Sequence, residues 1–359
     1  MSRASAQASV EEVGGFDTII DARSPAEYAE DHLPGSVSLP VLSDEERARI
    51  GTLYKQVSAF EAKKLGAALV ARNIARHIED HLLDKPRDWR PLVYCWRGGQ
   101  RSGAFSLILR EIGWDARRLE GGYKAWRRHV IAQLVQLPAR LQFHVISGAT
   151  GSAKSRVLEA LRARGAQTLH LEELAAHKGS VLGSLPERPQ PGQKAFESQL
   201  YAALSRFSHE QPVFVEAESR KIGRLHLPEA LIEAIRAAPG SRIDASRDAR
   251  IDFLVGDYDY AVADAAWLLP RLEHLKGLQS TETVNRWQEL VRRGEHRTLV
   301  GELLDAHYDP LYQRSQAANY PSYSARPGLA TDDLSPAGID QLAAAILATS
   351  GGTGGRSCG

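Results

Sequence analysis

The chain has 359 residues, a length that predicts two or three domains at about 100–200 residues each. Hydrophobic residues make up 43% and charged residues 25%, as in soluble globular proteins, which excludes a wholly disordered or fibrous chain. Basic and acidic residues nearly cancel, 45 against 44, so a nucleic-acid site would have to be a local basic patch.

The cellular setting follows from what the sequence lacks. No apolar run approaches the roughly 18 residues of a membrane span, and the N-terminal segment has no secretory apolar stretch. We therefore expect a cytoplasmic protein that does not bind a membrane. The two cysteines, Cys95 and Cys358, exclude a disulfide framework, and Cys358 lies in a Gly/Ser-rich tail. Only Cys95 is expected in folded sequence.

The first part of the chain alternates strand and helix patterns. We expect strands over residues 16–21 and 91–94, helices over 45–83 and 102–113, and a connector that is helical until Pro138. Alternation of this kind is typical of an α/β domain with a mainly parallel sheet.

A second alternating region follows the connector. It is expected to contain strands over 141–147, 167–174 and 213–219, helices over 156–165, 194–207 and 228–238, and mostly helical sequence from about 250 to 305. The predicted boundaries are a disordered N-terminus over 1–12, a first domain over 13–133, a second over 134–345, and a disordered tail over 346–359.

The cysteine stands in a loop between a strand and a helix. Backbone N–H groups in such a loop, together with the helix N-terminus, stabilise an anion. Glycines permit the tight curl and arginines can bind an oxyanion, which suits a thiolate nucleophile with an anionic donor. The alternative, a buried structural cysteine, is disfavoured by this composition. The nucleophile is Cys95, and the predicted anion cradle is Trp96, Arg97, Gly98, Gly99, Gln100, Arg101 and Ser102.

The segment GATGSAKS resembles a phosphate-binding loop. It fits the pattern G-x-x-x-x-G-K-[ST] except that Ala153 replaces the last glycine, which we expect to be tolerated only with a negative φ. Lys154 would reach the terminal phosphate and Ser155 could hold Mg²⁺. The predicted phosphate-binding residues are Gly148, Thr150, Gly151, Ser152, Ala153, Lys154 and Ser155.

Charged residues suggest two further sites. Glu216 and Glu218 end a strand where a Walker-B carboxylate would orient a metal or water, although carboxylates at strand ends are also common without a function. Basic residues could contact phosphate groups or tRNA, although the sequence slightly favours a solvated helix face for those near residue 127. These basic residues are Arg127, Arg128, Arg220, Lys221 and Arg224.

Three blocks in order identify the first domain by resemblance. DARSPAEYAEDHLPGSVSLP, CWRGGQRS and LEGGYKAWRR together resemble the rhodanese domain, with Cys95 as the nucleophile that carries a chalcogen. The C-x5-R spacing departs from the commonest sulfurtransferase loop and resembles the cell-cycle tyrosine phosphatases of the same fold. A wider cradle of this kind would admit a tetrahedral phosphate-like donor.

Over most of its length the chain resembles the tRNA 2-selenouridine synthase family. The segments SDEERARIGTLYKQ and FVEAESRKIG belong to neither generic domain, and the segment HYDPLYQRS near the C-terminus adds to the resemblance. The resemblance implies an α/β protein with a rhodanese-like domain, then a P-loop NTPase-like domain with a helical C-terminal part.

The same resemblance implies a transferase that converts wobble 2-thiouridine in tRNA to 2-selenouridine. Geranyl diphosphate would alkylate the sulfur, and selenium from selenophosphate would then replace the S-geranyl group. Cys95 would carry selenium as S-selanylcysteine, the P-loop would hold geranyl diphosphate, and ATP is not required. The expected partners are tRNA and a selenophosphate-producing enzyme, with a monomer favoured.

Other functions remain open on the sequence. A P-loop kinase fused to a cysteine-dependent phosphatase fits C-x5-R, although Tyr94 stands where such phosphatases usually have His. A generic sulfurtransferase is a further reading. A non-enzymatic rhodanese scaffold is disfavoured because Cys95, Arg97 and Arg101 are all present.

Overall fold

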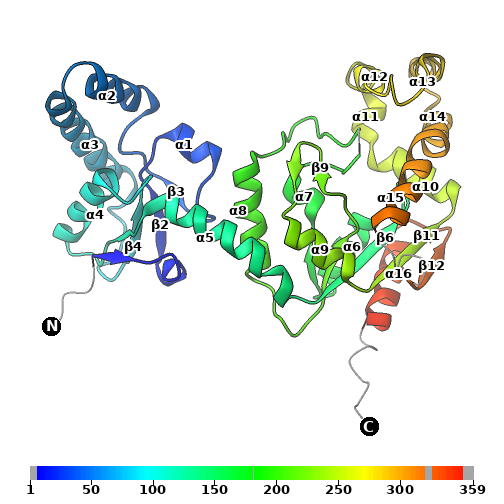
Figure 1. Cartoon of the computed structure of the whole chain (residues 1–359), viewed down its shortest axis with the longest axis horizontal. Coiled ribbons are helices and arrows are strands. Elements are labelled where there is room, and N and C mark those ends of the chain that lie inside the picture. The colour runs from blue at the N-terminus through cyan, green and yellow to red at the C-terminus, as the bar shows by residue number, and fades with distance from the viewer. Residues whose placement is uncertain (1–5, 181, 320–325, 351–359) are drawn as a thin grey trace, which may run out of the picture. The chain divides into compact units, whose positions relative to one another are not determined.

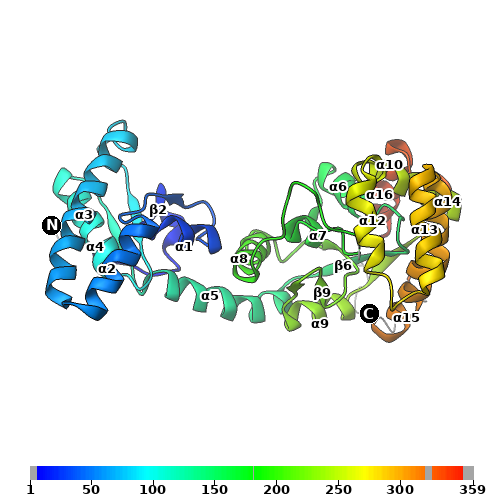
Figure 2. The ribbon, with the colours of Figure 1, turned by 90° about the horizontal axis from the view of Figure 1, so that it is seen from above.

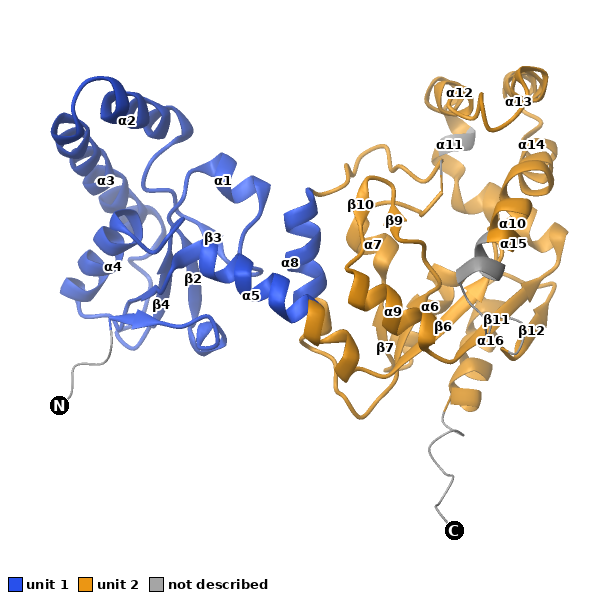
Figure 3. Cartoon of the chain, viewed as in Figure 1, with its two compact units in different colours: residues 1–134, 192–202 blue, residues 135–191, 203–359 orange. Residues whose placement is uncertain are grey.

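The computed structural model describes residues 6–180, 182–319 and 326–350. The chain forms two compact units (Figure 3), one of residues 1–134 with 192–202 and the other of residues 135–191 with 203–359. Cys358 lies outside the described residues.

The first unit is built on a parallel five-stranded sheet in the order β1-β5-β4-β2-β3. Its central strand β4 (Pro91–Tyr94) is buried along its whole length, as expected for a parallel sheet between helical layers. The strands are β1 (Gln7–Ala8), β2 (Thr18–Asp21), β3 (Val37–Ser38), β4 and β5 (Arg117–Leu119). The helices are α1 (Pro25–Glu30), α2 (Asp44–Gln56), α3 (Ala59–His81), α4 (Gln100–Ile112) and α5 (Gly122–Gln136), with a 3₁₀ turn at Val13–Gly15.

Two expectations for this unit need correction. Residues 6–12, expected to be disordered, are ordered because Gln7–Ala8 pairs in parallel with β5 and Ala8 is buried. The single helical stretch predicted over 45–83 is two helices, α2 and α3, which lie side by side (Figures 1 and 2). Ser43 and Ser58 each cap one of them by accepting a backbone N–H, so the chain begins a new helix after Ser58.

Residues 192–202, which include most of helix α8 (Gln193–Leu204), belong to the first unit, although the sequence-based division assigned them to the second. Arg127 of α5 donates to the Ser198 hydroxyl at 3.1 Å and to the Glu197 carboxylate at 2.5 Å. Ser198 in turn donates to the buried carboxylate of Asp31. These polar contacts between distant segments cannot be recognised from local periodicity.

The second unit contains another parallel five-stranded sheet, in the order β12-β11-β6-β8-β7. β6 (Phe143–Gly148) is buried throughout and lies between β8 (Val213–Glu216) and β11 (Gly240–Ala245). The chain leaves β6 toward β7 (Gln167–Leu169) and leaves β8 toward β11, on the opposite side. A ligand site is expected where parallel strands diverge in this way, at their carboxyl ends.

Parts of the second unit differ from the sequence prediction. β11 and β12 (Gly328–Thr331) were not predicted, and the strand expected over 167–174 ends at Leu169, after which α7 (Leu171–Ala175) begins. The remaining sheet-associated elements are α6 (Lys154–Ala163), β9 (Lys221–Ile222), β10 (Leu225–His226), α9 (Glu229–Ala237) and α16 (Pro336–Ser350), with a 3₁₀ turn at Pro138–Arg140. Helix α16 occupies residues 346–350, the start of the tail predicted to be disordered.

A helical subdomain follows β11, as the sequence predicted. It comprises α10 (Arg247–Asp257), α11 (Asp259–Ala263), α12 (Ala265–Glu273), α13 (Thr281–Arg293), α14 (His296–Leu303), the π-helical turn η3 (Leu304–Tyr308) and α15 (Asp309–Asn319). Figures 1 and 2 show α12, α13 and α14 side by side. They bury Trp287 with leucines from all three helices. The α/β class with a helical C-terminal part is therefore confirmed.

No helix in the described part of the chain is long and apolar enough to span a bilayer.

Candidate functional site

The cysteine loop joins β4 to α4 in the first unit. Cys95 follows β4 directly and is buried, with 3% of its surface exposed. Its Sγ accepts hydrogen bonds from the Gly99 backbone N–H at 3.3 Å and from the Ser102 hydroxyl at 3.2 Å. Both donors stabilise negative charge on the sulfur, which is what a thiolate nucleophile needs.

The LEGGYKAWRR block closes against this loop. The backbone N–H groups of Tyr123 and Lys124, at the start of α5, donate to the carbonyls of Cys95 and Trp96 at 2.8 and 3.1 Å. Gly122 has a φ of +57°, and a Cβ there would lie 2.2 Å from the Cys95 carbonyl oxygen. Only glycine permits this approach, so the spacing between the two blocks has a steric cause.

The predicted cradle residues are not equivalent. Gly98 has a φ of +65° and supplies the turn, while the Trp96 ring stacks on Tyr123 with centroids 5.4 Å apart. Arg101 donates to the Glu27 carboxylate of α1 at 2.7 Å, an ion pair that the sequence did not suggest. Arg97 and Gln100 are exposed, so Arg97 is the cradle arginine on the surface.

The phosphate loop joins β6 to α6 in the second unit. Gly151 has a φ of +83°, and a Cβ at Gly148 would lie 2.3 Å from Ser152 Oγ, so both glycines are required. Ala153 has a φ of +56°, which corrects the expectation that alanine needs a negative φ there. The loop keeps its left-handed turn at this position, and the buried methyl group packs in the core with Val157 and Leu158.

Lys154 and Ser155 begin α6, where the helix dipole favours an anion. Lys154 Nζ donates to the Gly148 carbonyl at 2.9 Å. The Ser155 hydroxyl donates to the Glu172 carboxylate at 3.0 Å, which brings α7 to the loop. Thr150 lies in the same loop and lines the adjoining cavity.

The HYDPLYQRS segment forms hydrogen bonds to the phosphate loop, directly and through Arg250. The Gly148 N–H donates to the Tyr312 hydroxyl at 2.9 Å. Arg250 donates to the Thr150 carbonyl at 2.8 Å and to both carboxylate oxygens of Asp309, at 3.1 and 2.6 Å. Tyr312, Arg250 and Asp309 were not predicted as site residues, although Tyr312 and Asp309 lie in a segment that contributes to the family resemblance.

Three carboxylates gather at the ends of β8 and α7. Glu216 accepts the Glu172 backbone N–H at 3.1 Å, and Glu172 and Glu218 both lie against Gly179. Burial, reinforced by the charge of Glu172, raises the pKa of Glu216 to about 8. Burial likewise raises the pKa of Glu218 well above its usual value, with Glu172 and Glu216 adding to the effect. The cluster therefore holds protons at neutral pH.

These groups line a cavity of about 560 Å³ beside Lys154. Several buried polar atoms of its lining residues have no hydrogen-bond partner in the described structure, namely His170 Nε2, His177 Nδ1, Glu216 Oε2 and His307 Nε2. Burial lowers the pKa of each of the three histidines, so they are neutral at pH 7. Orphaned polar atoms beside a phosphate loop indicate a site for a polar ligand.

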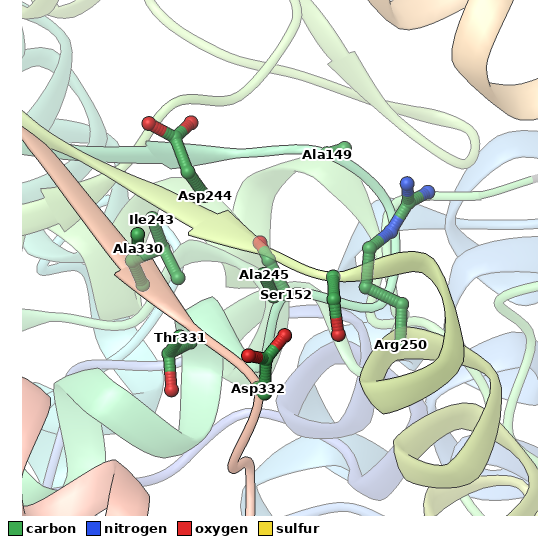
Figure 4. Close-up of a pocket in the computed structure, with 10 residues that line it drawn as sticks. Ala149, Ser152, Ile243, Asp244, Ala245, Arg250, Ala330, Thr331 and Asp332 are labelled. Carbon is green, nitrogen blue, oxygen red and sulfur yellow. The ribbon is translucent and has the colours of Figure 1, made fainter.

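A second hollow of about 450 Å³ lies against the loop at Ala149 and Ser152. Its lining side chains come from the loop, β11, α10 and the β12 end (Figure 4). Asp244, Asp332 and Arg250 line it, whereas Lys154 and Ser155 at the N-terminus of α6 line only the cavity of about 560 Å³. The cavity beside Lys154 is therefore the better phosphate site.

The predicted phosphate or tRNA contacts divide into two groups. Arg127 is only 12% exposed and bonds to α8, so it is used within the first unit and not presented at the surface. Arg128 is exposed on the same helix. Arg220, Lys221 and Arg224 are exposed around the β9–β10 hairpin, and Arg224 donates to the Gln190 carbonyl at 2.5 Å.

Together these features define a class of protein that combines a rhodanese-like cysteine loop and a P-loop in one chain. Family comparisons agree: a Rhodanese-like domain model matches residues 4–129, and a model described as the tRNA 2-selenouridine synthase AAA domain matches residues 141–282.

Similar proteins cover both units. A tRNA 2-selenouridine synthase of Nitrosomonas europaea is 36% identical over 244 residues, which are 67% of this chain and 63% of that protein. Others from Alcanivorax borkumensis and Aeromonas salmonicida are 34% and 33% identical over 82% of this chain, covering 88% and 86% of those proteins. The chain belongs to the tRNA 2-selenouridine synthase family, a family of tRNA-modifying enzymes.

Proposed function

We propose that this enzyme converts wobble 2-thiouridine in tRNA to 2-selenouridine through an S-geranyl intermediate. The observation that carries the proposal is the pairing, in one chain, of a cysteine whose Sγ accepts two hydrogen bonds with a phosphate loop beside a cavity. The donors are geranyl diphosphate and selenophosphate, the latter supplied by a selenophosphate-producing enzyme.

The first step is S-alkylation at the phosphate loop. The thiocarbonyl sulfur attacks C1 of geranyl diphosphate, the C–O bond breaks, diphosphate leaves, and the base loses its N3 proton. Lys154 and the loop N–H groups stabilise the charge that develops on the leaving diphosphate. Alkylation turns a poor leaving group, the thiocarbonyl sulfur, into a good one.

The second step replaces the S-geranyl group with selenium. Selenium at the selenide level forms the new bond to C2, geranylthiol leaves, and water takes the phosphoryl group of selenophosphate as phosphate. This exchange needs no oxidant. Loading selenium onto Cys95 as S-selanylcysteine is a two-electron oxidation that needs a disulfide as oxidant, which is reduced to two thiols, and a thiol reductant returns those electrons on delivery. A mass increase of one selenium atom on the Cys95 peptide distinguishes the selanyl route.

Mg²⁺ fits the phosphate site only when diphosphate binds there with it. The described residues include no group of three or more metal-binding side chains able to hold an ion on their own. Ser155 Oγ and Glu172 would hold it, because Mg²⁺ usually binds through one or two protein groups plus phosphate oxygens and water. When bound, the ion would neutralise diphosphate charge. ATP hydrolysis is not part of the scheme.

Two variants test the steps separately by mass spectrometry of tRNA nucleosides. Lys154→Ala should abolish S-geranyl-2-thiouridine while the first unit stays folded. Cys95→Ser should stop formation of 2-selenouridine and leave the S-geranyl nucleoside to accumulate. Normal S-geranyl product from Lys154→Ala, or normal 2-selenouridine from Cys95→Ser, would overturn the corresponding assignment.

The C-x5-R spacing supports a second candidate, a kinase fused to a cysteine-dependent phosphatase. Release of phosphate from an aryl phosphate by the purified enzyme, lost in Cys95→Ser, would favour it. The family membership favours the tRNA-modifying function instead.

A further inference from the structure

A narrow apolar cavity adjoins the phosphate site in the second unit. Thr150 of the phosphate loop lines both spaces, together with Ser180, Leu254, Tyr258 and Tyr308. The apolar cavity therefore shares these wall residues with the cavity beside Lys154. Its deeper walls are aliphatic and come mainly from α12, α14 and η3: Leu182, Leu268, Leu299, Val300, Leu303 and Leu304.

The residues that line the apolar cavity determine which kind of ligand it can bind. Among the described residues, His296 is the one polar residue of the deeper wall, so a nucleotide base would find few groups there to bind its polar edge. The volume, about 70 Å³, is roughly half that of the 150 Å³ cavity that admits benzene. A flat bicyclic base is too large for this space, whereas the slender end of a branched hydrocarbon chain fits it.

The two cavities together fit a ligand that has an anionic head group and an apolar tail. The head site has Lys154, the N-terminus of α6 and orphaned polar atoms. The tail site has leucines and a valine, and the rings of Tyr258 and Tyr308 stand at the junction. Burial raises the pKa of Tyr308 to about 12, so its hydroxyl stays neutral beside the ligand.

We infer that the leucine-lined cavity of the helical subdomain binds the terminal isoprene unit of a prenyl diphosphate whose diphosphate lies on the phosphate loop. This inference rests on the proposed function and locates its alkyl donor. The helical subdomain then limits the length of the prenyl group that the enzyme accepts. The first isoprene unit lies at the mouth, near Thr150, where its C1 is next to the leaving diphosphate.

Calorimetry on the full-length protein tests the inference with a ligand series. Geranyl diphosphate should bind at least tenfold more tightly than dimethylallyl diphosphate, because burying each methylene improves affinity several-fold. Inorganic diphosphate should bind most weakly. Equal affinities for geranyl diphosphate and inorganic diphosphate would overturn the tail site.

A cavity-filling variant gives an independent readout. Val300→Phe should weaken geranyl diphosphate at least tenfold and leave inorganic diphosphate within twofold, whereas Val135→Phe, at an exposed site outside the cavity, should change neither. An equal loss for both ligands would overturn the tail site, as would a selective loss of ATP binding.

The two proposals fail in different ways. If Lys154→Ala leaves inorganic diphosphate binding unchanged, the phosphate assignment fails, and the tail inference with it. If diphosphate binding depends on Lys154 and the geranyl chain adds no affinity, the tail site alone is wrong.

Discussion

The guanidinium of Arg101 donates to the Glu27 carboxylate at 2.7 Å, with both side chains mostly buried at 21% and 13% exposure. The arginine that defines the C-x5-R spacing is thus held by α1. Burial opposes ionisation of Glu27, but the hydrogen bond and charge of Arg101 outweigh it and lower the pKa of Glu27. The pair is therefore ionised at neutral pH and ties the cysteine loop to the DARSPAEY block.

Glu27→Gln should cost about 1–2 kcal/mol of unfolding free energy at pH 7. A carboxylate with a lowered pKa stabilises the fold above its unfolded pKa, near 4.5, and loses that effect as pH falls. The difference from the parent should therefore shrink below pH 4.5, as measured by urea denaturation. Glu30→Gln, which breaks an exposed pair with Lys194, should change stability by at most about 0.5 kcal/mol.

Ser102→Ala should slow the Cys95-dependent step about tenfold, because it removes one of the two donors to Sγ. The rate of Cys95 alkylation by iodoacetamide at pH 7 should fall in parallel. Ser106→Ala is the matched control, since Ser106 is equally buried on α4 but donates to the Gly103 carbonyl. Equal effects of the two variants would show that Ser102 has only a structural role.

Tyr312→Phe should destabilise the second unit by about 1–2 kcal/mol, because the Gly148 N–H loses its acceptor. Diphosphate binding should weaken as well, since Gly148 begins the phosphate loop. Tyr260→Phe is the control: the buried Tyr260 hydroxyl has no hydrogen-bond partner among the described residues, so its removal should be neutral or stabilising. Unchanged diphosphate affinity in Tyr312→Phe would contradict the supporting role of the C-terminal segment.

Glu216→Gln should make the protein more stable than the parent by a margin that grows from pH 5 to 8. A carboxyl with a raised pKa binds its proton more tightly in the folded state, so stability falls as pH rises from about 4.5 toward 8. The amide removes this dependence at one position, and the gain at pH 8 should be about 1–3 kcal/mol. Thermal unfolding at several pH values measures this gain. Glu229→Gln, at an exposed position, is the control, and its effect on stability should not change with pH.

Much of the fold could be predicted because local sequence carries it. FDTIID, PLVY, LQFHVIS and VFVEAES are apolar runs bounded by turns, and each covers most or all of a strand of one of the two five-stranded sheets. The strands β11 and β12 were not predicted because GSRIDA and GLAT have no clear apolar pattern. Both segments are strands because they pair with neighbouring strands of the sheet. Gln7–Ala8 was missed for the same reason.

The sequence by itself determined the two loops, since a strand, a glycine-rich turn and a helix follow each other within about fifteen residues and set the positions of Cys95 and Lys154. Tertiary structure alone decided what surrounds them. Glu27 reaches Arg101 from 74 positions away, and Tyr312 reaches Gly148 from 164. Local propensity holds no information about such pairs, because they form only when the packing of the core brings distant helices to the ends of the sheet.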